Sequence, residues 1–116
     1  MSIKHASPSE VIHLQPLGSN IASTKTYTLF KTEAMEAIRL VLPAGKHIAE
    51  HKAPGEITVL CLEGSVKFTS QGVPKELSAG DFLYLNASDR HAVEAMEDSS
   101  LLVTILLKNP LNSSGD

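Results

Sequence analysis

Apolar and polar residues alternate along much of the chain with the two-residue period of β-strands. Ile38, Leu40 and Leu42 fall on one face of one stretch, and Val66 and Phe68 fall on one face of another. Successive side chains of an extended strand point to opposite faces, so each stretch has one apolar face to bury. The chain shows no alternation of helical and extended patterns, and it is therefore predicted to be all-β.

Turn-forming residues divide the chain at short and even intervals. Glycine, proline, asparagine and aspartate gather at residues 43–45, 53–55, 63–64, 70–72, 78–81, 86–89 and 97–99. The intervals hold about four to eight residues, which suits strands and is too short for ordinary helices. Strands are expected near 22–30, 34–42, 46–52, 57–63, 65–70, 73–77, 82–86, 91–96 and 100–107. Residues 8–13 are expected to form either a brief helical turn or an edge strand.

The stretch 57–63 is apolar on both faces. Ile57, Val59 and Cys61 share one face, while Leu60 and Leu62 lie on the other. Such a strand is expected to be covered on both sides, as in a sandwich or at a dimer interface. Many short strands joined by regular turns predict a sandwich, a barrel or a jelly roll.

Composition narrows the class of protein. A chain of 116 residues with 42% hydrophobic and 20% charged residues fits one globular domain. A formal net charge of −3 without a basic cluster argues against a nucleic-acid or membrane partner. The lone Cys61 has no internal disulfide partner, and residues 1–5 lack the apolar core of a signal peptide. A cytoplasmic location is expected.

Two stretches hold glycines, acidic residues and histidines in a particular order. The first, 42–64, contains Gly45, His51, Glu56 and a closing Leu-Glu-Gly, and the second, 77–94, contains Gly80, Asp81 and His91. A short hairpin at 70–72 separates them. In this order and spacing, the pair resembles the two motifs of the cupin superfamily.

The resemblance implies a double-stranded β-helix, the RmlC-like jelly-roll barrel, with its ligand or metal site inside. The barrel is expected over residues 20–108, after an N-terminal segment at 1–19 and before a flexible tail at 109–116. In cupins with the full motif, three histidines and one glutamate hold a divalent metal. Imidazole and carboxylate ligands suit iron, manganese, nickel or zinc.

This chain departs from the full metal motif. His51 and His91 stand at two of the ligand positions, but Ala53 and Ile57 stand at the other two. Glu56 lies one residue before the expected glutamate, and the turn before it could absorb that difference. The candidate metal ligands are therefore His51, His91 and Glu56, holding one divalent metal or none. His47 has the same parity as His51 and is a further, weaker candidate.

Two functions from different classes remain open. In the first, the chain binds a small molecule inside the barrel, with His51 and His91 as polar anchors and with Ile57, Val59 and Cys61 as lining. In the second, it is a metal-dependent oxygenase, isomerase or decarboxylase acting on a small organic acid. No catalytic residue is assigned. Both readings predict a homodimer, formed through the second face of 57–63 and the segment 20–30.

Overall fold

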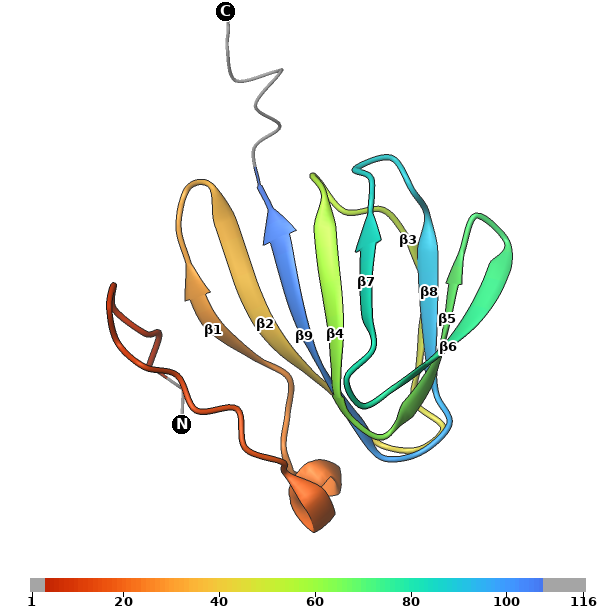
Figure 1. The fold of residues 1–116 in the computed structure, drawn as a ribbon, viewed down its shortest axis with the longest axis horizontal. Helices are drawn as coiled ribbons and strands as arrows, with labels where there is room; N and C mark the ends of the chain where they lie inside the picture. The colour runs from red at the N-terminus through yellow and green to blue at the C-terminus, as the bar shows by residue number, and fades with distance from the viewer. Residues whose placement is uncertain (1–3, 108–116) are drawn as a thin grey trace, which may run out of the picture.

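The structure is a computed structural model that describes residues 4–107. In this range the chain forms one short 3-10 helix and nine strands, drawn in Figure 1. They are η1 (Gly18–Ser23), β1 (Tyr27–Lys31), β2 (Met35–Leu42), β3 (His47–His51), β4 (Ile57–Glu63), β5 (Ser65–Ser70), β6 (Val73–Ser78), β7 (Phe82–Leu85), β8 (His91–Ala95) and β9 (Ser99–Leu106). The all-β prediction is confirmed. The tail expected at 109–116 lies outside the described residues.

The strands form two antiparallel sheets that face each other (Figure 1). One sheet has the order β1-β2-β9-β4-β7, and the other has the order β3-β8-β5-β6. From β2 to β5 the chain changes sheet at every step, and it changes again on entering β7, β8 and β9. This repeated crossing is the arrangement of a jelly roll.

The apolar faces predicted by the alternation meet between the sheets. Val59 and Leu101 come from the five-stranded sheet, and Val66 and Phe68 come from the four-stranded sheet. All four are buried, with at most 2% of their surface exposed. Val59, Phe68 and Leu101 also line a cavity between the sheets, while Val66 lies in the part of the core away from this cavity.

The N-terminal part differs from the prediction. Residues expected to begin a strand at 22 instead close the helix η1, because the Thr24 hydroxyl and amide bond back to Asn20 and Ile21. Ile21 is buried against the barrel, with 1% of its surface exposed. Residues 8–13 form neither a helical turn nor an edge strand.

A buried ion pair fastens the N-terminal segment to the outer face of the five-stranded sheet. The guanidinium of Arg39, on β2, lies 3.0 Å from the carboxylate of Glu63, on β4. Arg39 also donates to the Gln15 carbonyl oxygen, and Glu63 accepts from the Leu17 and Gly18 amides. With 1% of Arg39 exposed, removal of either charge would leave the other buried without its counter-charge.

The pKa of the Glu63 carboxyl reflects opposing influences. Burial by itself would raise this pKa, but hydrogen bonds from Leu17, Ser100 and Gly18 and the charge of Arg39 lower it below 4.5. The folded chain therefore favours the ionised carboxylate.

The outer face of β4 and β7 is only partly covered. Leu60 and Leu62 are half-buried, while Phe82 and Tyr84 on β7 are 66% and 55% exposed. The inner face of β4 is buried as expected. A homodimer that covers the outer face stays a prediction. No helix in residues 4–107 has the length and apolar character needed to cross a membrane.

The Glu63→Gln variant is expected to lower the free energy of unfolding by about 2 kcal/mol, because it leaves the Arg39 charge buried without a counter-charge. Urea unfolding of the two proteins measures this difference. The matched control is Glu94→Gln, which breaks the exposed pair between Glu94 and Lys67 and is expected to cost less than about 1 kcal/mol. Equal losses in the two variants would contradict the role given to the buried pair.

The same variant yields a pH dependence. Because the pKa of Glu63 is lowered by folding, its contribution is present above the ordinary value of 4.5 and is lost as the pH falls through the folded pKa. The stability difference between wild type and Glu63→Gln is thus expected to shrink in acid. Urea curves recorded on both sides of pH 4.5 test this. A stability difference between the two proteins that is the same on both sides of pH 4.5 would contradict this expectation.

Candidate functional site

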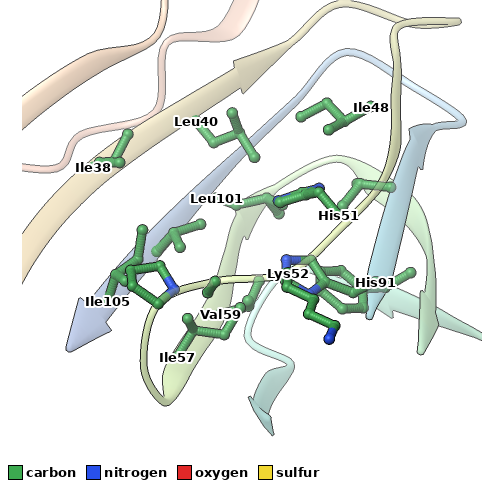
Figure 2. Close-up of a pocket in the computed structure, with 15 residues that line it drawn as sticks. Ile38, Leu40, Ile48, His51, Lys52, Ile57, Val59, His91, Leu101 and Ile105 are labelled. Carbon is green, nitrogen blue, oxygen red and sulfur yellow. The ribbon is translucent and has the colours of Figure 1, made fainter. Parts of the chain in front are cut away.

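The cavity between the sheets is apolar, has a volume of about 230 Å³, and is here called the barrel cavity. Its polar side chains, among the described residues that line it, are His51, Lys52 and His91. The remaining lining is apolar and comes from Ile38, Leu40, Ile48, Ala53, Pro54, Ile57, Val59, Phe68, Val93, Leu101, Val103 and Ile105. Figure 2 shows the two imidazoles side by side at one end of this group, with Ile38 and Ile105 toward the other.

A β-bulge in β3 places His51 in the cavity. Ile48 pairs with Val93 and His51 pairs with His91, so three steps along β3 match two along β8. The extra residue reverses the alternation, and Ile48 and His51 both line the cavity although their parities differ. His47 faces the other side beside Glu94. The parity argument that made His47 a further metal candidate is therefore wrong.

His51 and His91 are directly opposite each other on neighbouring strands. Their ring centroids are 4.3 Å apart with an interplanar angle of 62°. His91 also stacks on Phe68, at 5.6 Å between centroids and 11° between planes. His91 is buried and His51 is exposed, so His91 lies in the interior of the cavity and His51 lies at its mouth.

Both imidazoles are fixed in the same tautomer by the backbone. The Nδ1 of His51 lies 3.0 Å from the Ala49 carbonyl oxygen, and the Nδ1 of His91 lies 3.2 Å from that of Asp89. A carbonyl oxygen can only accept, so each Nδ1 donates its hydrogen. In a neutral imidazole the Nε2 is then an unprotonated acceptor, and it lies on the side of the ring away from the main chain.

The environment of His91 favours its neutral form. Burial lowers the pKa of His91 below 6.5, and the bond to the Asp89 carbonyl opposes this effect only in part. The charge that His51 can carry lowers this pKa further.

Glu56, the third candidate metal ligand, is not brought to the imidazoles. Its carboxylate accepts a 2.6 Å hydrogen bond from the hydroxyl of Tyr84, which is exposed on β7, and Glu56 does not line the barrel cavity. The backbone fixes this placement, since the Glu56 carbonyl accepts from the Leu106 amide. A Cβ atom at neighbouring Gly55 would collide with the Leu106 carbonyl oxygen, so the strands meet closely here.

The three predicted apolar lining residues separate into two groups. Ile57 and Val59 line the barrel cavity. Cys61 lies deeper in the packed core, 1% exposed, and its thiol donates weakly to the Glu63 carbonyl oxygen. Burial raises the pKa of the Cys61 thiol, which therefore stays protonated at neutral pH.

The donor set does not fit the closed metal centre that the full motif implies. The described residues contain no group of three or more histidine, cysteine, aspartate or glutamate side chains able to hold a metal ion. We therefore derive no chemistry through a metal.

Some of the lining could be anticipated and some could not. Phe68 falls on the apolar face predicted for its strand, which is how it comes to lie beneath His91. Lys52 and Ile48 carried no signal, because their inward placement depends on the bulge in β3 and the turn that follows it.

Two antiparallel sheets face each other around a cavity, and the chain crosses repeatedly between them, as in a double-stranded β-helix. The family model described as the Cupin domain matches residues 38–107, and the chain belongs to this family. The fold expected from the motifs is thereby confirmed.

Solved structures agree with this assignment. A conserved protein of unknown function from Streptococcus pyogenes is similar at 18% identity and a TM-score of 0.72, covering 94% of this chain and 96% of that one. An RmlC-like cupin with a double-stranded β-helix fold from Methanocaldococcus jannaschii is similar at 16% identity and a TM-score of 0.70, with 86% and 93% covered. A predicted oxalate decarboxylase from Thermotoga maritima is similar at 25% identity and a TM-score of 0.65, with 72% and 79% covered. No curated protein matches the chain.

The Ala53→His variant is expected to bind Ni²⁺ roughly tenfold more tightly than wild type, because Ala53 lines the cavity with His51 and His91 and a third imidazole would complete a facial set. Isothermal titration calorimetry on chelator-treated protein measures the affinity. The same change in a His91→Ala background is the control and should show little gain. An unchanged affinity in the single variant would mean that residue 53 does not point at the pair.

Proposed function

We propose that this cupin binds a small, largely apolar molecule inside the barrel cavity, with His51 and His91 as its polar contacts. The supporting observation is the composition of the lining, in which apolar residues surround a single pair of imidazoles. Ligand sites commonly combine an apolar wall with a few placed polar groups. Burial of ligand surface against that wall supplies the affinity, and the imidazoles supply the orientation.

The size of the cavity limits the ligand. An engineered cavity of about 150 Å³ lined by leucine, isoleucine and phenylalanine holds benzene. The barrel cavity, at about 230 Å³, has room for one substituted ring or an aliphatic chain of similar bulk. Its open mouth beside His51 and Lys52 leaves a route for entry.

The alternative, a metal-dependent enzyme, has less support from this site. Oxalate decarboxylase is the description given to the Thermotoga maritima relative. Transfer of that activity to this chain would require a metal centre, and only two of the proposed donors converge here. The apolar wall also suits oxalate poorly, because a small dianion would lose its hydration without enough polar partners.

Toluene is a suitable probe for the apolar wall. It is expected to raise the melting temperature of wild type, because a ligand that binds only the folded chain stabilises it by mass action. Ile38→Trp, which fills the cavity from β2, is expected to abolish this rise. The matched control is Val73→Trp, on the exposed hairpin, which should keep it. A toluene response that is absent from wild type, or that survives Ile38→Trp, would overturn the proposal.

A further inference from the structure

The polar end of the barrel cavity offers hydrogen-bond acceptors to a bound molecule. The Nδ1 of His51 donates to the Ala49 carbonyl oxygen at 3.0 Å, and the Nδ1 of His91 donates to the Asp89 carbonyl oxygen at 3.2 Å. Each neutral ring is left with an unprotonated Nε2 as its remaining polar atom. The ring centroids are 4.3 Å apart and both residues line the cavity, so a small group beside the pair can contact either ring.

This arrangement selects for a particular kind of polar group. A hydroxyl can donate its hydrogen to one of the two Nε2 atoms, and both atoms are equivalent acceptors in this respect. A carboxylate has no hydrogen to donate, so its oxygens would face nitrogen lone pairs. It would also lose its hydration in a largely apolar cavity, which is costly without a partner of opposite charge.

Lys52 is the one lysine or arginine among the described residues that line the cavity, and it does not reverse this preference. It is exposed, so its ammonium keeps its water while its aliphatic part lies against the cavity mouth. The buried member of the polar set is His91, and it is flanked by Phe68 and not by a charge.

We propose that the ligand class of this cavity is a small alcohol or phenol, whose hydroxyl donates to the Nε2 of His51 or His91 while its apolar body fills the space between the sheets. This inference rests on the proposed function, since it names the class of molecule bound at the same site. One ring with one hydroxyl matches both the volume and the acceptor pair.

Four probes of nearly equal shape test the inference. They are p-cresol, which carries a hydroxyl, 4-methylanisole, in which the hydroxyl hydrogen is replaced by a methyl group, p-toluate, which carries a carboxylate, and toluene, which carries no polar group. Titrations of the full chain, followed by calorimetry or by NMR in the presence of a chelator, give the four affinities. We expect p-cresol to bind about five- to tenfold more tightly than 4-methylanisole or toluene, the range of one net hydrogen bond.

Substitutions of the two histidines test whether the imidazoles cause the tighter binding of p-cresol. His51→Phe and His91→Phe keep a ring at each position but remove the acceptor, and each is expected to reduce the preference of p-cresol over toluene. His51→Gln, which retains an acceptor oxygen, should keep part of it. Since His51 is exposed, its variants remain informative even if a change at buried His91 prevents folding.

The outcomes separate this inference from the proposed function. Equal binding of p-cresol and toluene, tighter binding of p-toluate, or a p-cresol preference that survives both phenylalanine variants would overturn the hydroxyl assignment while leaving an apolar binding site. Absence of binding by all four probes would overturn both. A p-cresol preference that appears only without chelator would also overturn it, because a metal would then carry the contact.

Discussion

The bulge in β3 decides the chemistry of the barrel cavity. Without the extra residue between Ile48 and His51, a regular strand that faces Ile48 inward would turn the His51 imidazole outward, as it does that of His47. With it, His51 comes directly opposite His91 on β8. One local departure from regular pairing thus adds a second imidazole beside His91 at the polar end of the cavity, and bulges commonly redirect side chains in this way.

Different parts of the barrel stabilise the fold and form the cavity. Away from the cavity, buried residues such as Leu42, Cys61 and Val66 pack together and stabilise the fold. On the outer face, the Arg39–Glu63 pair holds the N-terminal segment against β2 and β4. Because these contacts stabilise the fold, the residues around the cavity do not need to fill it, although protein interiors are otherwise closely packed.

Much of the fold followed from local alternation and turns, because those signals depend on neighbours in sequence. The strands from β2 to β9 lie close to their expected ranges for this reason. The facing of His51 and His91 also agrees with the motif spacing. The Arg39–Glu63 pair was not foreseen, since its partners Gln15 and Leu17 lie in a segment without a periodic pattern. The side to which Glu56 turns depends on the close contact of Gly55 with β9, which only the assembled sheets reveal.

Ligand binding as proposed depends on two neutral imidazoles whose Nε2 atoms are unprotonated, on residues that both line the apolar cavity. Long-range ¹H–¹⁵N NMR correlations of the histidine rings report which nitrogen carries the hydrogen. When both rings are neutral, His51 and His91 are each expected to show a protonated Nδ1 and a bare Nε2, and these Nε2 signals are expected to move when p-cresol is added. Rings protonated at Nε2, or Nε2 signals indifferent to every cavity probe that binds, would contradict it.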